Sequence, residues 1–198
     1  MIKVGKKIIL ASCSPRRHAL LKQIGLPFEI RDSGVEELLP DSFPPHEYVT
    51  KLSLLKAETV AQSVDNAIII AADTIVVIDN KILGKPSDAN EAKKMLRFLS
   101  GCEHQVYTGF TLIDRPSNKW ISDVETTDVK FRILSNPEID EYVASGSPMD
   151  KAGSYGIQDD YGAVFVEKIN GCFYNIVGFP LTKFYIRFKE FQQSLGII

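Results

Sequence analysis

The feature that most constrains the fold is an apolar run over residues 67–78, which is followed by the turn residues Asp79 and Asn80. Only Asp73 and Thr74 interrupt this run, and its composition predicts a buried strand. An ionised carboxylate inside an apolar strand costs several kcal/mol of folding free energy unless it is paired or binds a metal. The alternative is that Asp73 is exposed, at a point where one strand ends and another begins.

Strand and helix patterns alternate in the first part of the chain. We expect a strand at 7–11, a helix at 15–24 and a strand at 28–31, which is the opening of an α/β fold. A helix is expected from Pro44 and Pro45 to about residue 63, and the pair Asp88 and Glu91 predicts the start of another helix that Gly101 ends.

The second half of the chain predicts antiparallel pairing. Two strand patterns within 105–131 flank a turn at 115–118, so the sheet is expected to be mixed. Helices are expected at 137–145 and 180–193, and the run 163–169 is expected to form a hairpin with 172–177. At 198 residues the chain is expected to form a single domain over 1–198.

Composition excludes several classes of function. The formal net charge is −2, and no basic stripe is interleaved with aromatic residues, so we expect no nucleic-acid partner. No apolar stretch approaches the roughly eighteen residues of a membrane span, so a protein of the cytoplasm without a membrane partner is expected. Cys13, Cys102 and Cys172 have no metal-site or disulfide spacing and are expected to be free thiols, with a catalytic role for Cys13 disfavoured.

The turn between the first strand and the first helix is a candidate phosphate site. Ser14 suits the N-cap and Pro15 the first helical position, whereas Arg16 and Arg17 add positive charge where the helix dipole is already positive. A bound phosphate would relieve that conflict, and Ser12 adds a further hydroxyl. The alternative is that both arginines point into water.

Two further groups of residues indicate a function only when they are considered together with this turn. Glu36, Glu37, Lys56 and Lys85 would each alone be solvated charges, but as a set they supply carboxylates for Mg²⁺ and cations for a triphosphate. The segment 150–158 contains two glycines that permit close backbone approach to a ligand, and it ends at Gln158. Taken alone, this segment is a weak signal.

With these residues described, the chain resembles the Maf family of nucleotide pyrophosphatases almost from end to end. Four motifs match in order, and the closing stretch 169–180 also fits. The motifs are Ser12-Cys13-Ser14-Pro15-Arg16-Arg17, Ala72-Asp73-Thr74, Gly84-Lys85-Pro86 and Asp150-Lys151-Ala152-Gly153-Ser154-Tyr155-Gly156-Ile157-Gln158.

The resemblance implies a fold and a set of roles. The fold is α/β, with an elongated mixed β-sheet, flanking helices and two lobes around a central cleft, similar to the inosine triphosphate pyrophosphatases, and the protein is expected to be a homodimer. Asp73 would accept the proton of the attacking water and share Mg²⁺ or Mn²⁺ with Glu36. The groups that would hold the phosphates are Lys56, Lys85, Ser12, Ser14, Arg16 and Arg17.

Three positions indicate the branch of the family that cleaves dTTP and UTP. Arg16, Thr74 and Gln158 stand where the 7-methyl-GTP branch carries Trp, Gln and Glu. The expected function is therefore metal-dependent hydrolysis of a pyrimidine nucleoside triphosphate to the monophosphate and pyrophosphate. Asp159 and Asp160 depart from the family pattern next to Gln158.

Two alternatives stay open at this point. One is a 7-methyl-GTP pyrophosphatase. The other is a non-catalytic nucleotide-binding regulator of septum formation, which would not need to retain Asp73 in an apolar strand.

Overall fold

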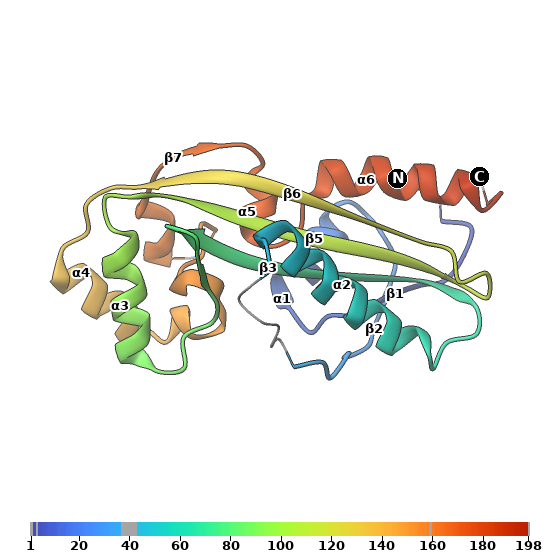
Figure 1. The fold of residues 1–198 in the computed structure, drawn as a ribbon, viewed down its shortest axis with the longest axis horizontal. Coiled ribbons are helices and arrows are strands. Elements are labelled where there is room, and N and C mark those ends of the chain that lie inside the picture. Colours follow the sequence, from blue (N-terminus) through green and yellow to red (C-terminus); the bar gives the residue numbers. More distant parts are fainter. Residues whose placement is uncertain (1, 3, 37–42, 159, 198) are drawn as a thin grey trace. The chain divides into compact units, whose positions relative to one another are not determined.

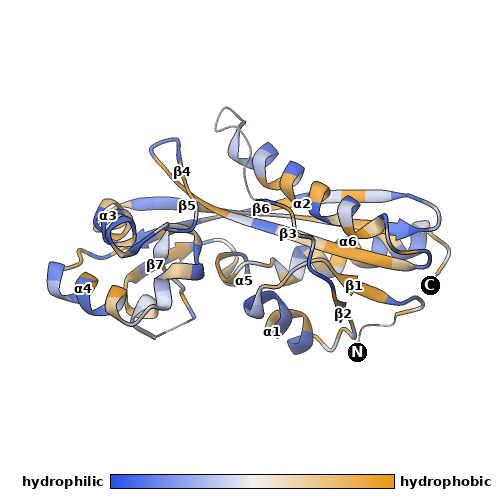
Figure 2. Cartoon of the chain, turned by 90° about the horizontal axis from the view of Figure 1, so that it is seen from below, coloured by the Kyte–Doolittle hydropathy of each residue, from blue (hydrophilic) through white to orange (hydrophobic). Residues whose placement is uncertain are grey.

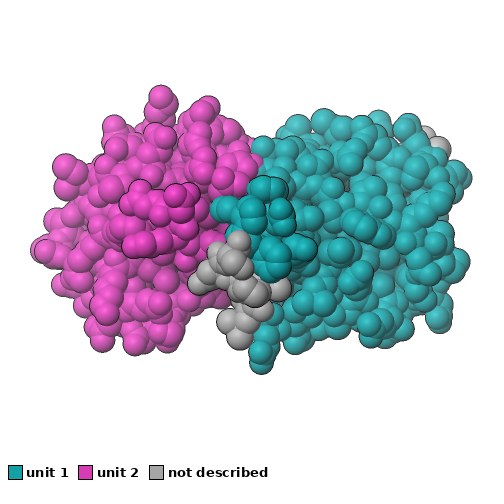
Figure 3. Space-filling model, in the orientation of Figure 1, with its two compact units in different colours: residues 1–73, 108–125, 178–198 teal, residues 74–107, 126–177 magenta. Residues whose placement is uncertain are grey.

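The computed structural model describes residues 2, 4–36, 43–158 and 160–197, so Glu37 and Asp159 lie outside the described residues. The chain forms two compact units (Figure 3). Unit 1 contains residues 1–73, 108–125 and 178–198, and unit 2 contains 74–107 and 126–177. A single domain and a cleft between two lobes stay predictions.

A mixed β-sheet with flanking helices is the central element of the fold (Figure 1). Within the described residues its strand order is β2-β1-β3-β5-β6-β7, and β4 pairs with β3. β1 is parallel to both β2 and β3, whereas the pairs β3–β4 and β6–β7 are antiparallel. The predicted α/β class and mixed sheet are confirmed. The strands are β1 Ile8–Leu10, β2 Glu29–Ile30, β3 Ala67–Ile78, β4 Lys81–Leu83, β5 Glu103–Arg115, β6 Trp120–Phe131 and β7 Val166–Asn170.

Unit 1 packs helices against the first part of β3. The helices are α1 Pro15–Gln23, α2 Pro45–Ala61 and α6 Leu181–Ser194. Figure 2 shows α1 and α2 on opposite sides of β3, and β1 in the hydrophobic colour. Because both faces are covered, Ile8 to Ala11 and Ala67 to Ala72 are buried, as expected for parallel strands.

Unit 2 is built on the second part of β3 and on helices α3 Ala89–Leu99, α4 Asn136–Ala144 and α5 Phe173–Val177. Asp88 caps α3 by accepting a hydrogen bond from the backbone N–H of Glu91, and α4 begins with a capping box of Ser135 and Glu138. Three short 3₁₀ helices follow α4, at Ser147–Asp150, Ala152–Ser154 and Asp160–Val164. A core that includes Val76, Phe131 and Tyr155 holds these elements together.

The predicted hairpin of 163–169 with 172–177 is wrong. Phe173–Val177 forms the short helix α5, and β7 pairs antiparallel with β6 instead. Side-chain contacts stabilise the turn before α5, because Thr127 Oγ1 accepts from the backbone N–H of Cys172 and from Asn175 Nδ2. A short apolar run forms a strand or a helix with little difference in pattern, so tertiary contacts decide between them.

In the described residues, no helix is both long enough and apolar enough to cross a membrane.

Candidate functional site

The serine–arginine turn follows β1 in unit 1. Ser14 is the N-cap of α1, but its side chain makes no capping hydrogen bond to the helix. Instead Ser12 Oγ accepts from the backbone N–H of Ser14 at 3.2 Å and from Arg17 Nη1 at 3.2 Å, and Arg17 Nε donates to the carbonyl oxygen of Gly178 at 3.0 Å. The alternative in which Arg17 points into water is therefore wrong. Arg16 is half-buried.

The register of β1 with β3 places this turn near Asp73. Leu10 pairs with Ile70, and the N–H of Ala11 donates to the carbonyl of Ile70 at 2.7 Å. Beyond this pair, β1 gives way to the turn while β3 continues for three more residues to Asp73, about 10 Å at strand rise. Continued past Leu10, this register brings Ser12 to the level of Ala72, the residue before Asp73.

Asp73 is buried in β3, with 4% of its surface exposed, and it is paired with Lys56, which is 5% exposed. Lys56 Nζ donates to Asp73 Oδ1 at 2.7 Å. The alternative of an exposed Asp73 between two strands is wrong, because β3 runs through Asp73 without a break. The cost of burying the carboxylate is offset by a charge-assisted hydrogen bond, and the ammonium stabilises the negative charge of Asp73.

One face of α2 brings Lys56 to this position. Val49, Ser53 and Lys56 recur at the spacing of a single helix face. Ser53 Oγ is 2.9 Å from Thr111 Oγ1 of β5, and a Cβ built on Gly109 of β5 would lie 2.7 Å from the backbone of Val49. Because Gly109 has no side chain, α2 approaches the sheet closely enough for the Lys56–Asp73 ion pair to form.

Unit 2 contains Thr74 on β3 and Lys85, which lies two residues after the end of the paired strand β4. Val76 of β3 pairs with Leu83 of β4, so continuing this register by two residues brings Lys85 to the level of Thr74. Thr74 is half-buried and Lys85 is exposed.

The glycine loop, residues 152–158, contacts β3 and the residue that follows β4 through Gly153. The N–H of Gly153 donates to the carbonyl of Gly84 at 3.0 Å, and a Cβ on Gly153 would lie 2.9 Å from Val76. The loop therefore contacts the residue immediately before Lys85. Gln158 is exposed at the end of the loop.

The two carboxylates expected to bind a metal are in different environments. Asp73 is buried, whereas Glu36 is exposed in the segment after β2. Among the described residues, no group of three His, Cys, Asp or Glu side chains is placed to hold a metal ion. Mg²⁺ is commonly held by one or two carboxylates together with substrate phosphates, so Asp73 and Glu36 provide donors of the right chemistry. Their role as metal ligands stays a prediction.

Two other features are separate from these residues. Cys13 is exposed, and desolvation together with the Asp32 carboxylate raises the pKa of its thiol, which disfavours the nucleophilic thiolate.

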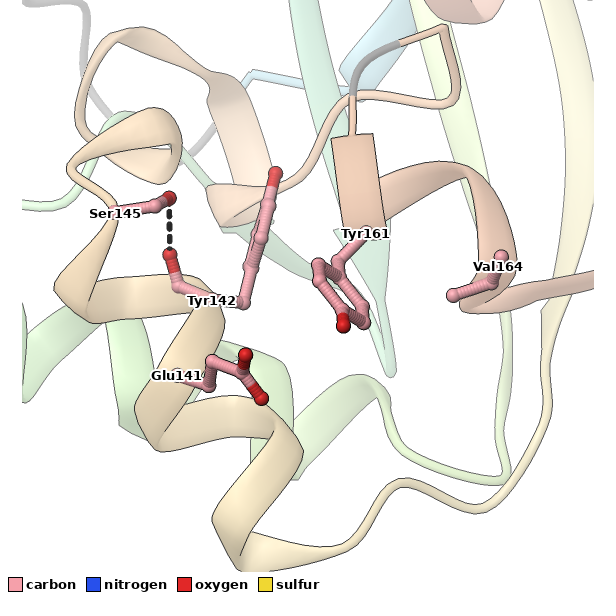
Figure 4. A pocket seen from close by; sticks show the side chains of 5 residues that line it. All are labelled: Glu141, Tyr142, Ser145, Tyr161 and Val164. Atoms are coloured by element: carbon pink, nitrogen blue, oxygen red, sulfur yellow. Dashed lines mark hydrogen bonds between the residues drawn. The ribbon is translucent and has the colours of Figure 1, made fainter.

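A shallow pocket of about 530 Å³ in unit 2 is lined by Glu141, Tyr142, Ser145, Tyr161 and Val164 (Figure 4). It contains none of the predicted site residues.

His104 lies in none of the motifs that the sequence contains. This histidine on β5 is 2% exposed, and its Nε2 lies 2.8 Å from the hydroxyl of Tyr155 in the glycine loop. In the structure, buried and more exposed residues alternate at the start of β5 with His104 among the buried ones, but nothing in the sequence identifies Tyr155 as its partner.

The fold and these residues define a mixed α/β protein with a serine–arginine turn and a buried Lys–Asp pair at the end of β1. Residues 7–191 match the family model described as Maf-like protein, and the chain belongs to this family.

Curated relatives match over nearly the whole chain. The dTTP/UTP pyrophosphatase of Bacillus mycoides (strain KBAB4) is 47% identical over 190 residues, which cover 96% of this chain and 98% of that protein. The dTTP/UTP pyrophosphatase of Salinibacter ruber (strain DSM 13855 / M31) is 48% identical, over 93% and 91% of the two chains. Among solved structures, the Staphylococcus aureus Ham1 protein matches 64% of this chain and 72% of its own at 16% identity, with a TM-score of 0.42.

Proposed function

We propose that the protein hydrolyses dTTP and UTP to the nucleoside monophosphate and pyrophosphate. The observation that carries this proposal is the buried Lys56–Asp73 ion pair, which lies at the end of β1 where the serine–arginine turn begins. A carboxylate that can accept a proton and a set of cations that can bind phosphates are the groups that such a hydrolysis needs. The names of the curated relatives support the choice of substrate.

In this reaction a water molecule attacks the α-phosphorus atom. A new bond forms between the water oxygen and the phosphorus, the bond from that phosphorus to the bridging oxygen of the β-phosphate breaks, and pyrophosphate leaves. Asp73 accepts the proton of the water. Arg16, Arg17, Lys56 and Lys85 neutralise the phosphate charges, with Ser12 and Ser14 as hydroxyl donors.

We propose that Asp73 and Glu36 hold Mg²⁺ or Mn²⁺, which would supply positive charge at the phosphates. Carboxylate oxygens favour these hard cations over zinc. EDTA treatment is expected to abolish turnover, and Mg²⁺ or Mn²⁺ is expected to restore it. Full turnover after exhaustive chelation would contradict this assignment, and restoration by zinc alone would mean that other residues bind the metal.

Gln158, Thr74 and Arg16 are proposed to select the base. The amide of Gln158 offers both a donor and an acceptor, which matches the acceptor–donor–acceptor edge of uracil and thymine. Cytosine replaces one acceptor with an amino donor and lacks the N3 proton, so buried polar groups would lose partners at about 1–3 kcal/mol. UTP and dTTP are therefore expected to be cleaved about tenfold to a hundredfold faster than CTP at equal subsaturating concentration.

The test is a panel of dTTP, UTP, CTP and 7-methyl-GTP assayed for the products. Pyrophosphate and the monophosphate of dTTP or UTP are the expected products. Release of orthophosphate and a diphosphate would contradict the cleavage site, and a preference for 7-methyl-GTP would place the protein in the other branch. Binding of nucleotide without release of either product would favour a non-catalytic regulator.

A further inference from the structure

The hydrogen bond between His104 and Tyr155 lies in the apolar core of unit 2. Both residues are almost completely buried, with 2% and 5% of their surfaces exposed. Their rings meet edge to face at 5.4 Å, and each also packs edge to face on Phe131, at 4.9 Å and 4.7 Å between centroids. Since Phe131 contacts both rings, neither can rotate without losing an aromatic contact.

The backbone immediately before Tyr155 has an unfavourable conformation. Ser154 has a φ of +62°, which is rare for a residue with a side chain, and Gly153 has a φ of +66°. Such conformations persist where surrounding contacts determine them. Here the contacts are the hydrogen bond of Gly153 to Gly84, the contact of Ser154 Oγ with Met95 Sδ at 3.1 Å, and the His104–Tyr155 bond.

If His104 only filled space in this core, its polar ring would cost more folding free energy than an apolar side chain. Burial lowers its pKa from 6.5 to about 4, so the imidazole is neutral near pH 7, and its Nδ1 has no hydrogen-bond partner among the described residues. An apolar side chain of similar volume would avoid the cost of burying that polar nitrogen. The feature that an apolar side chain would lose is the hydrogen bond to Tyr155.

We propose that His104 is a positioning residue for base selection, which acts by holding Tyr155 and hence the glycine loop in the conformation that presents Gln158. Tyr155 is three residues before Gln158, and the loop is fixed at its other end by Gly84 next to Lys85. This inference rests on the proposed function, because it assigns to Gln158 a role in recognising the pyrimidine.

The test compares variants that differ in this one hydrogen bond. Tyr155→Phe removes only the hydroxyl. His104→Gln places an amide close to the position of Nε2 and retains a polar partner, whereas His104→Leu does not. Thr127→Val is the matched control, because it removes a buried hydroxyl of unit 2 that bonds Cys172 and Asn175 rather than the glycine loop.

The main measurement is the ratio of kcat/KM for UTP to that for CTP, together with the Tm of each variant. Tyr155→Phe and His104→Leu are expected to lower the ratio about threefold to tenfold, as expected for one lost hydrogen bond, and His104→Gln less. Thr127→Val is expected to lower the Tm and leave the ratio unchanged. A ratio that follows the Tm across all four variants would show a merely structural role and would overturn the proposal.

A second readout does not depend on activity. Amide hydrogen exchange of residues 152–158 in the whole protein is expected to be faster in Tyr155→Phe and His104→Leu than in the wild type and in Thr127→Val. Unchanged exchange in this segment would overturn the positioning role, even in an active enzyme. A wild type that releases no pyrophosphate would instead contradict the proposed function, while faster exchange would still support the role of His104 in fixing the loop.

Discussion

At the scale of single residues, the Lys56–Asp73 ion pair links stability to chemistry. Because both side chains are buried, neutralising one of them removes a charge-assisted hydrogen bond from the charge that remains. Removal of one member of a buried pair typically costs about 3–5 kcal/mol, whereas replacing both members is often much less costly. Mutation of Asp73 therefore has two separable effects.

We predict that Asp73→Asn lowers turnover by at least about 10²-fold, the lower end of what a positioned general base contributes, and also lowers the Tm. The double variant Lys56→Met/Asp73→Asn is expected to recover part of the lost Tm without recovering turnover. Steady-state kinetics and calorimetry on the same preparations measure both effects. Near-normal turnover in Asp73→Asn would show that another group accepts the proton.

Gln158 is the residue on which the base preference is predicted to depend. Gln158→Glu removes the amide donor and adds a negative charge, so the kcat/KM for UTP relative to CTP is expected to fall at least about tenfold. Gln193→Glu is the matched control, because Gln193 is an exposed glutamine in α6. An unchanged ranking of nucleotides in Gln158→Glu would contradict the proposed base contacts.

At the scale of elements, the sequence predicts those helices and strands that have a signal in their own residues or in the residues next to them. The bounds of β3 agree with the apolar run, and Pro15 and Asp88 mark the beginnings of α1 and α3, because strand composition and capping residues act over a few neighbours. The segment 173–177 was not predictable in this way. Its helical form depends on Thr127, which is distant in sequence.

The same distinction applies to the candidate site. The serine–arginine turn and Asp73 stand out in the sequence, because their charges conflict with a local environment. The pairing of Lys56 with Asp73, and of His104 with Tyr155, depends on how α2 and the glycine loop pack on the sheet. Those contacts join residues far apart in the chain, so a local pattern does not reveal them.

The close contact of α2 with β5 gives a prediction at this scale. Gly109→Ala is expected to destabilise the protein by about 1–3 kcal/mol or more, because the added Cβ would meet the backbone of Val49, which cannot rotate away. Gly84→Ala is the control for stability, since a Cβ there has no neighbouring atom of the described residues within 4 Å. Similar Tm values for the two variants would contradict the close packing of α2 on the sheet.

At the scale of the whole molecule, His104 is expected to make the free energy of unfolding depend on pH under acidic conditions. The unfolded chain takes up the imidazole proton near pH 6.5, but the folded protein does so only near pH 4. Stability is therefore lost as the pH falls through this window, by about 3 kcal/mol at roughly 1.4 kcal/mol per pKa unit, and the loss levels off below it.

We predict that His104→Leu reduces the fall in unfolding free energy between pH 6.5 and pH 4, measured by urea denaturation at a series of pH values. Glu138 provides a comparison in a lower window. Its pKa is lowered from 4.5 to about 2, chiefly by a hydrogen bond from Arg132, so its contribution is present above pH 4.5 and is lost toward pH 2. An unchanged slope in His104→Leu between pH 6.5 and pH 4 would contradict the burial of a neutral imidazole.

The residues of the two units alternate along the sequence, and their order has a consequence for synthesis on the ribosome. The chain passes from one unit to the other at 73/74, 107/108, 125/126 and 177/178, so unit 2 has all its residues once Val177 has been made. Unit 1 begins first but still lacks α6, whose Phe184 and Phe188 are fully buried in the finished protein. Phe184 packs edge to face on Phe110 of β5, so this part of the core of unit 1 stays incomplete until α6 has been made, and unit 1 is the part of the nascent chain that most needs protection by chaperones.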